Sequence, residues 1–312
     1  MDFDLNADQE QLQDAVAHAS AKYRTAPIHP VFHAYDTDLD RDLGQGGFFD
    51  VQRQDGYGPL DAALTVETLS RLPRCAEIGA SLLVAPKLLA DALPRPIALL
   101  SRPDVAAARF LAQAKTAIID AGDDVLILDL EGMARVETES LYAYPFGAFA
   151  SPPDLSRARR LGATAVPVLR QWWRLVIAME AVGALQAALE FTVEYLKTRR
   201  QFGRPLGSFQ AIQHRLAGGT ALIQGLRWQA LNAAWSQDPV DAALAATFAQ
   251  EAAQSVAYDL HQFSGALGLT LEHPLHFWTW RLKALQGELD ALHGQAAAAA
   301  DLAWPRRRES AS

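Results

Sequence analysis

The feature that most constrains this chain is a run, residues 169–198, that is apolar on nearly every side. Charged residues interrupt it in only a few places, among them Arg174, Glu180 and Glu190. A helix that is hydrophobic on most faces has to be enclosed by other elements. Three more long helical segments follow with short loops between them, at residues 209–235, 240–263 and 274–300. This pattern predicts an antiparallel four-helix bundle in the C-terminal half.

The rest of the chain divides where its residue composition and hydrophobic pattern change. Helical segments at residues 8–24, 60–72 and 77–93 predict an N-terminal helical domain, residues 1–94. Between 95 and 160, prolines, glycine turns and short apolar runs such as Val125–Leu130 predict a reduced β-rich middle domain. The bundle then occupies residues 161–305, and residues 306–312 form a solvated tail. The expected fold class is therefore mainly α, with a truncated β middle segment.

Net charge and cysteine content restrict the possible partners and the cellular compartment of the protein. A net charge of −8 argues against a general nucleic-acid binder, which needs a basic face for phosphates. The single cysteine, Cys75, cannot form an internal disulfide, which fits a reducing compartment. The acidic start, Met1 to Asp4, lacks the pattern of a signal peptide, and no uninterrupted apolar run reaches the ~18 residues of a membrane span. We expect a cytoplasmic protein with no nucleic-acid or membrane partner.

Two motifs on the bundle segments carry a family resemblance. Residues 195–206 read YLKTRRQFGRPL, and residues 262–268 read QFSGALG. The first resembles the Arg-x-Gln-Phe-Gly corner of the acyl-CoA dehydrogenase family. The second resembles that family's Gln-x-x-Gly-Gly-x-Gly turn, with Ala266 in place of the second glycine. The resemblance covers residues 165–285 well, and the N-terminal helices only loosely, through Glu67 and Arg71.

The resemblance implies an acyl-CoA dehydrogenase-like fold and an FAD cofactor held at a subunit interface. Carried over by position, the cofactor-contacting residues are Arg199, Gln201, Phe202, Gln210, Gln262 and Gly265. Arg199 would hold the diphosphate, because a guanidinium presents a planar fork of donors and stays charged. Gln210 would lie near the adenine, and glycines would let the backbone approach the cofactor. The alternative is that the first motif has only a structural role, as a basic helix end followed by a turn.

No catalytic base is assigned. The family usually removes the proton alpha to the thioester with a glutamate in a Tyr-Glu-Gly-Thr turn, but residues 285–291 read LQGELDA. Glu288 and Asp290 are the nearest carboxylates, and we expect both to be solvated, although either could be the base. Trp173 stands where the family's alternative glutamate lies, and Glu180, two turns away, is expected to be a helix-packing or interface residue.

The missing glutamate and the short middle segment both indicate a chain without a complete catalytic site of its own. The chain resembles the smaller, non-catalytic subunit of heteromeric acyl-CoA dehydrogenases, including those that degrade sterol side chains and steroid rings. The implied assembly is an α2β2 heterotetramer that acts on an acyl-CoA, in which a longer subunit supplies the base. Two alternatives stay open: a self-sufficient homo-oligomeric dehydrogenase, and a structural or binding helical protein that has lost the flavin. A third is a metal-binding bundle.

The hypothesis of a metal-binding bundle rests on one group of residues, His261, Glu272, His273 and His276. A di-metal bundle needs paired Glu-x-x-His motifs on two helices and two further inward glutamates. These residues instead straddle Pro274 in a predicted loop. We therefore expect them to be loop or capping residues, with no metal site.

Overall fold

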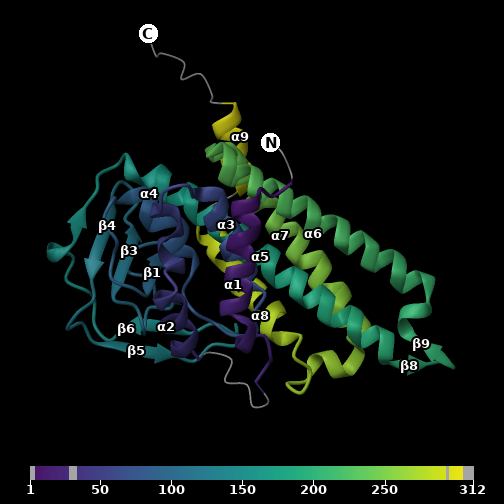
Figure 1. The fold of residues 1–312 in the computed structure, drawn as a ribbon. Coiled ribbons are helices and arrows are strands. Elements are labelled where there is room, and N and C mark those ends of the chain that lie inside the picture. Colours follow the sequence, from purple (N-terminus) through teal and green to yellow (C-terminus); the bar gives the residue numbers. More distant parts are fainter. Residues whose placement is uncertain (1–3, 28–33, 293–294, 305–312) are drawn as a thin grey trace, which may run out of the picture.

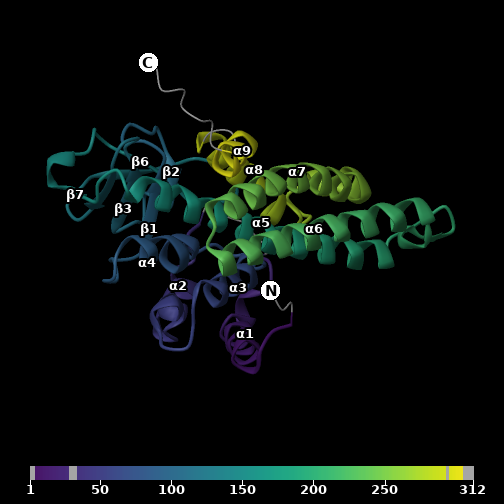
Figure 2. The ribbon, with the colours of Figure 1, turned by 90° about the horizontal axis from the view of Figure 1, so that it is seen from above.

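The structure, a computed structural model, describes residues 4–27, 34–292 and 295–304, so the expected tail at 306–312 lies outside the described residues. Figure 1 shows a β unit at one end of the molecule and long helices that extend away from it. Seen from above, the N-terminal helices lie on one side of α5, and α7, α8 and α9 lie on the other side (Figure 2). Helix α5 is therefore the central element of the molecule.

The four-helix bundle predicted from the sequence is confirmed. Its helices are α5 (Ala165–Thr198), α6 (Gln210–Ser236), α7 (Pro239–Ser264) and α8 (His276–Ala291). Helix α5 packs against the other three and against α3 (Pro59–Ser70). It is long and apolar enough to cross a bilayer, but 78% of its apolar window is buried inside the protein, as expected for the core helix of a bundle.

Close contact between α3 and α5 depends on one glycine. A Cβ atom at Gly183 of α5 would lie 2.4 Å from the carbonyl oxygen of Glu67 in α3. Any larger residue would push the two helices apart, so the N-terminal helices are seated directly on the bundle.

The N-terminal part differs from the sequence prediction in two places. Its helices are α1 (Ala7–Ala19), α2 (Thr37–Gln45), α3, the π-helical turn η3 (Ala80–Val84) and α4 (Ala85–Leu88). Helix α2 was not predicted, because its nine residues are mostly polar and only the N-cap Asp36, which accepts from the Leu39 amide, marks its start. The helix expected over 77–93 already ends at Leu88.

The last expected helix is also divided. Helix α8 ends at Ala291, where the Leu292 amide bonds back to the carbonyls of Glu288 and Leu289, and α9 (Gln295–Ala303) follows and packs on α7.

The middle segment is richer in strands than the sequence suggested. A four-stranded sheet has the order β1-β3-β4-β7, and a three-stranded sheet has the order β2-β6-β5. The strands are β1 (Ile97–Leu100), β2 (Ala108–Arg109), β3 (Thr116–Asp120), β4 (Val125–Asp129), β5 (Arg135–Thr138), β6 (Phe146–Phe149) and β7 (Arg159–Arg160). Two of them, β2 and β7, have only two residues, which is too short to leave an alternating pattern in the sequence.

The larger sheet joins two cores. Its cross-strand pair Ile118 and Ile127 belongs to the main core, which runs without interruption through the N-terminal helices and the bundle. The neighbouring pair, Ala117 and Leu128, belongs to a smaller core within the β unit. This alternation follows from successive side chains pointing to opposite faces of a strand. Domain boundaries at residues 94 and 160 stay a prediction.

Candidate functional site

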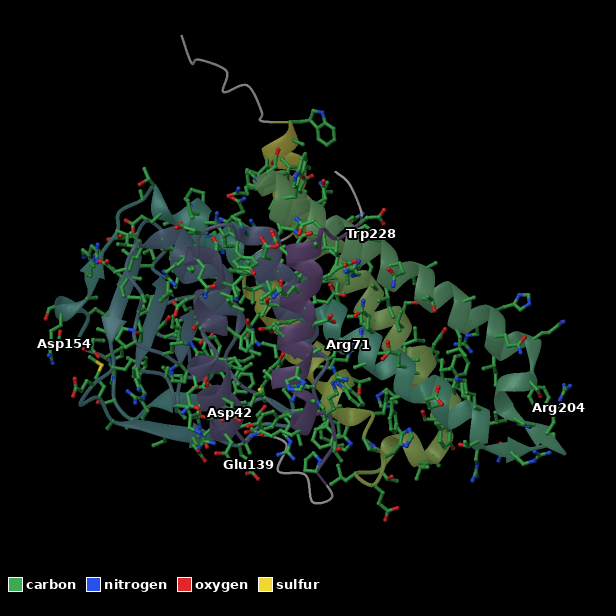
Figure 3. All side chains as sticks on the ribbon, viewed as in Figure 1. Asp42, Arg71, Glu139, Asp154, Arg204 and Trp228 are labelled. Carbon is green, nitrogen blue, oxygen red and sulfur yellow. The ribbon has the colours of Figure 1, made fainter. Side chains whose placement is uncertain are left out.

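The first predicted motif forms a hairpin at the free end of the bundle. Helix α5 ends at Arg199, and β8 (Arg200–Gln201) pairs with β9 (Arg204–Pro205) across a two-residue turn. The turn residues, Phe202 and Gly203, both have positive φ, 53° and 80°. That combination gives a tight hairpin whose twist matches the strands, but the left-handed region is costly for a phenylalanine. Figure 3 places Arg204 at this end, far from the sheets.

The side chains of this hairpin face solvent. Phe202 is 87% exposed, and its ring meets Phe209 edge to face with 6.1 Å between centroids. Arg204 stacks over the Phe209 ring at 4.0 Å. Within the described part of the chain, no carboxylate lies within 4 Å of Arg199, Arg200 or Arg204. The hairpin thus presents an aromatic ring and three arginines without acidic partners.

The second motif forms the turn that ends α7. Gln262 is exposed, and its carbonyl oxygen accepts the amide of Gly265. Gly265 has φ 62° and ψ −150°, a conformation that is essentially restricted to glycine. A Cβ atom at Gly268 would lie 2.5 Å from the Ser264 side chain. Both glycines are therefore required by the turn itself, whatever ligand it meets.

The structure brings both motifs to the same end of the bundle. Helix α6 starts at Gln210, whose side chain is exposed, and runs beside the last turns of α7. Arg215 of α6 donates from Nε to Asp259 of α7 at 3.1 Å and stacks on Phe263. The exposed Gln201 lies in the hairpin. All six residues predicted to contact a cofactor are thus exposed and lie at this end, and their role stays a prediction.

Three histidines hold the segment that follows the α7 turn. His261 bonds the Gly268 carbonyl oxygen at 3.1 Å and the Thr279 hydroxyl at 2.9 Å. His273 lies 3.3 Å from the Ser264 hydroxyl and packs against two aromatic rings of α5. His276 lies 2.8 Å from the His273 carbonyl oxygen. Burial lowers the pKa of all three imidazoles, so the neutral form is favoured.

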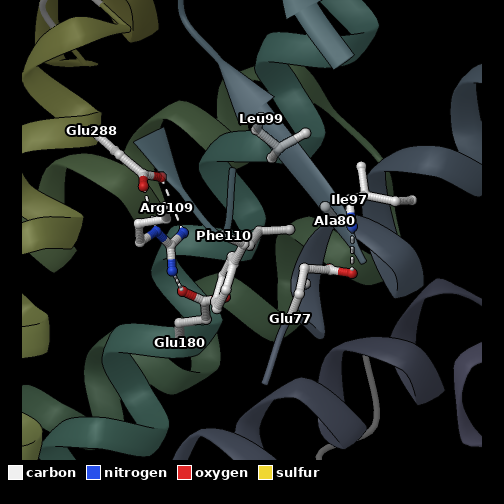
Figure 4. A pocket seen from close by; sticks show the side chains of 10 residues that line it. Glu77, Ala80, Ile97, Leu99, Arg109, Phe110, Glu180 and Glu288 are labelled. Carbon is white, nitrogen blue, oxygen red and sulfur yellow. Dashed lines mark hydrogen bonds and ion pairs between the residues drawn. The ribbon is translucent and has the colours of Figure 1, made fainter. Parts of the chain in front are cut away.

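A second group of polar residues is buried between the β unit and the bundle, and sequence reasoning missed two of its members, Arg109 and Tyr144. Arg109 of β2 donates from Nη1 to Glu180 of α5 at 2.7 Å and from Nη2 to Glu288 of α8 at 3.0 Å (Figure 4). Trp173 Nε1 donates to Glu288 at 3.0 Å, and the Tyr144 hydroxyl to Glu180 at 3.2 Å. We call Arg109, Tyr144, Trp173, Glu180 and Glu288 the buried charge cluster.

The electrostatics of the buried charge cluster follow from its burial. Burial raises the pKa of Glu180, and attraction to Arg109 partly offsets this rise. Burial would lower the Arg109 pKa, but attraction to Glu180 and Glu288 outweighs it, so the pKa is raised. Burial, and then the charge of Glu180, raise the pKa of Tyr144. The cluster is a Glu–Arg–Glu bridge in which each carboxylate has at least one further donor.

These contacts correct one expectation. Glu288 was expected to be solvated, but its side chain is only 18% exposed and is held by Arg109 and Trp173. Glu180, expected to be a helix-packing or interface residue, is buried inside the cluster, where it pairs with Arg109 of β2. Asp290 does lie at the surface, where Gln250 donates to it at 3.0 Å. One signal was available, because Trp173 and Glu180 are seven residues apart and so share a helix face.

A cavity of about 180 Å³ lies beside the buried charge cluster. Residues of β1, α5 and α8 line it, among them Leu99, Trp173 and Gly287, and Arg109 and Glu288 form part of its wall. An engineered apolar cavity of about 150 Å³ holds one benzene ring. The cavity is therefore of the size that encloses a single ring.

Comparison with known proteins agrees with this architecture. Residues 168–286 match the family described as acyl-CoA dehydrogenase, C-terminal domain. Acyl-CoA dehydrogenase IpdE2 of Mycobacterium tuberculosis is 39% identical over 104 residues, 33% of each chain. Acyl-CoA dehydrogenase FadE27 of the same species is 34% identical over 155 residues, which are 44% of this chain and 41% of that protein. The match thus spans less than half of these relatives.

Solved structures extend the likeness to the whole fold. The ChsE4-ChsE5 complex of Mycobacterium tuberculosis contains a chain that superposes with a TM-score of 0.82 at 23% identity, over 97% of this chain and 99% of that one. The Tcur3481-Tcur3483 steroid ACAD gives a TM-score of 0.76, also at 23% identity, over 95% and 96% of the two chains. The C-terminal part of the chain, residues 168–286, thus matches the acyl-CoA dehydrogenase family, and the chain as a whole shares the fold of these solved structures.

Proposed function

We propose that this chain is the non-catalytic subunit of a heteromeric FAD-dependent acyl-CoA dehydrogenase. It contributes the end of its bundle to an FAD site at the subunit interface, and a longer homologous subunit supplies the catalytic base. The assembly would be an α2β2 heterotetramer in the cytoplasm that dehydrogenates an acyl-CoA between its alpha and beta carbons. The activity requires the partner, and the proposed substrate is a steroid-derived acyl-CoA.

The observation that carries the proposal is the exposed hairpin at the bundle end. Phe202 is 87% exposed in a conformation that is costly for a side chain with a Cβ atom, and the three neighbouring arginines have no carboxylate within 4 Å among the described residues. An aromatic ring and unpaired guanidiniums suit a planar base and a diphosphate. These residues therefore fit the adenine and diphosphate part of FAD.

The residues of the interior fit the rest of the cofactor poorly, which supports the non-catalytic assignment. The cavity beside the buried charge cluster has room for one ring. Glu288, the carboxylate nearest to it, already accepts bonds from Arg109 and Trp173. A general base needs a free lone pair within hydrogen-bonding reach of the substrate proton.

The chemistry divides between the two subunits accordingly. Bound FAD supplies the acceptor for a hydride from the beta carbon. In this chain, Arg199 would hold the diphosphate, with Gln201 and Phe202 beside it, and Gln210 would lie near the adenine. Gln262 and Gly265 would approach the cofactor through their exposed turn. The neighbours whose names state heteromeric complexes or a steroid enzyme support the partner and the substrate class.

The test is to look for a longer acyl-CoA dehydrogenase in the neighbouring coding sequence and to co-express it with this chain. We expect a yellow complex that oxidises acyl-CoA, whereas this chain alone does not. Arg199→Ala should weaken FAD binding by about 2 kcal/mol or more, roughly thirtyfold, because a charge-assisted contact is lost. The matched control is Lys197→Ala, which removes an exposed cation that already pairs with Glu194 at 2.6 Å.

Two results would contradict the proposal. One is an Arg199→Ala complex that keeps stoichiometric FAD at unchanged affinity. The other is turnover by the isolated chain on the order of 1 s⁻¹ that Glu288→Gln or Asp290→Asn abolishes, which would assign the base to this chain and favour a self-sufficient dehydrogenase. A complex that forms but is colourless, because it binds no flavin, would favour a structural or binding protein.

A further inference from the structure

We propose that Lys87 is a modification site, at which an acyl-CoA thioester acylates the side-chain amine. Lys87 lies in α4, and its Nζ reaches a niche between α5 and the junction of α6 with α7. In the reaction the Nζ lone pair forms an amide bond with the thioester carbonyl carbon, and the carbon–sulfur bond breaks. Coenzyme A leaves as a thiol and takes up the proton that the nitrogen loses. The proposal does not rest on the proposed function, because neither FAD nor a partner subunit takes part in this reaction.

The first argument is that Lys87 lacks a counter-charge. Its hydrogen-bond acceptor is a neutral amide oxygen, Gln237 Oε1, at 2.7 Å. Among the described residues no carboxylate lies within 4 Å of Nζ. Gln237 is itself fixed, because it ends α6 with a φ of 55° and its carbonyl oxygen accepts a bond from Gln171 of α5 at 2.6 Å. An amide oxygen accepts a bond from an ammonium and from a neutral amine alike, so this contact positions the amine without requiring its charge.

The second argument is the partial burial of the Lys87 amine. Nζ lies 4.4 Å from the centroid of the Trp172 ring, and this indole is itself only 3% exposed. The ring covers one side of the amine and keeps water away from it. Burial lowers the pKa of Lys87, and no nearby charge opposes this effect, although the attraction of an indole face for a cation moderates it. The unprotonated amine, which is the nucleophile, is therefore more populated than in a hydrated lysine.

The third argument is the contrast with the other lysines of the chain. All four are exposed, namely Lys22, Lys115, Lys197 and Lys283. Lys22 and Lys197 each pair with a carboxylate at 2.6 Å, which favours the charged form. Lys115 and Lys283 have no carboxylate within 4 Å in the described part of the chain, but water surrounds their amines. Of these five lysines, Lys87 alone combines partial burial with the lack of a counter-charge.

The experiment is incubation of the isolated full chain with acetyl-CoA at pH 8, followed by peptide mass spectrometry. The initial rate of acetylation is measured at each lysine. We expect Lys87 to react at least about threefold faster than Lys115 and Lys283, because below the pKa each unit of lowering raises the unprotonated fraction about tenfold. In the chain unfolded by guanidinium chloride this preference should disappear. A Lys87 rate that does not exceed those of Lys115 and Lys283, or a preference that persists after unfolding, overturns the proposal.

One variant tests the role of the neutral acceptor. Gln237→Glu puts a carboxylate of nearly the same shape beside Nζ, which favours the ammonium and should slow acetylation of Lys87 about two- to fivefold. The rate at Lys115 should not change. The matched control is Gln254→Glu, which adds the same charge at an exposed position further along α7 and should leave the Lys87 rate as in the wild type. An unchanged Lys87 rate in Gln237→Glu with wild-type circular dichroism, or an equal loss in both variants, overturns the proposal.

Discussion

Replacing Arg109 with methionine should destabilise the isolated chain far more than any surface change. Arg109 is 6% exposed and is the only cation that bonds both Glu180 and Glu288 among the described residues. Methionine has a comparable volume and adapts its shape in a core, so the substitution removes the charge without opening a large cavity. What it leaves behind is a pair of buried carboxylates without their guanidinium.

The expected magnitude follows from what each carboxylate keeps. Breaking a buried ion pair by removing one partner typically costs about 3–5 kcal/mol. Glu180 keeps the Tyr144 hydroxyl and Glu288 keeps the Trp173 indole, so we expect the lower end, about 3 kcal/mol. Burial already raises the pKa of Glu180, and loss of Arg109 should raise it further. A carboxyl whose folded-state pKa lies above its unfolded value loses stability as the pH rises, so the deficit should be larger at pH 8 than at pH 5.

The assay is urea denaturation of the isolated chain at both pH values, followed by tryptophan fluorescence. The control is Arg102→Met, since Arg102 lies in the same segment and forms a largely exposed pair with Asp104 at 3.2 Å. It should change the free energy of unfolding by less than about 0.5 kcal/mol. A deficit below about 1 kcal/mol for Arg109→Met, or one that does not grow with pH, would refute the bridge as a stabilising contact.

Two further predictions concern the bundle end. Burial lowers the pKa of His261, His273 and His276 below the usual 6.5, so the unfolded chain binds more protons below that pH, and the free energy of unfolding should fall between pH 7 and 5. Urea denaturation across this range should show a shallower pH dependence for His273→Gln. Phe202→Gly should stabilise the isolated chain by about 1 kcal/mol, because glycine relieves the positive φ of 53°. The same variant should weaken FAD binding in the complex with the longer subunit, measured by flavin retention on dilution.

The helices of the bundle were predictable because their pattern is long and local. The segment expected at 209–235 is α6, Gln210–Ser236, and the one expected at 240–263 is α7, Pro239–Ser264. Each has many apolar residues at helical spacing and a clear stop signal. Short elements were less predictable. The nine residues of α2 and the two-residue strands β2 and β7 obtain their stability from tertiary contacts, which leave little trace in a local pattern.

The exposed hairpin motif and the buried charge cluster also differ in how well the sequence predicts them. The exposed motif around Arg199 is contiguous in sequence, so the sequence alone is enough to select its residues. The buried charge cluster is not contiguous, since Arg109 is 71 residues from Glu180 and 179 residues from Glu288. Glu288 looked solvated because nothing in its own helix compensates its charge. Its partner comes from a two-residue strand that the sequence did not predict.

Helix α5 therefore links two regions with opposite character. Near its start, Trp173 and Glu180 enter a cluster whose charges satisfy one another. At its end, Arg199 and the hairpin tip at Phe202 face solvent without acidic partners among the described residues. The charges of the cluster are compensated inside the fold, whereas the exposed hairpin has no acidic partner among the described residues, and the proposed function gives the hairpin an external contact. If the proposed function holds, the two regions are separable: Arg109 variants change the stability of the isolated chain, and Arg199 variants change only the affinity of the complex for FAD.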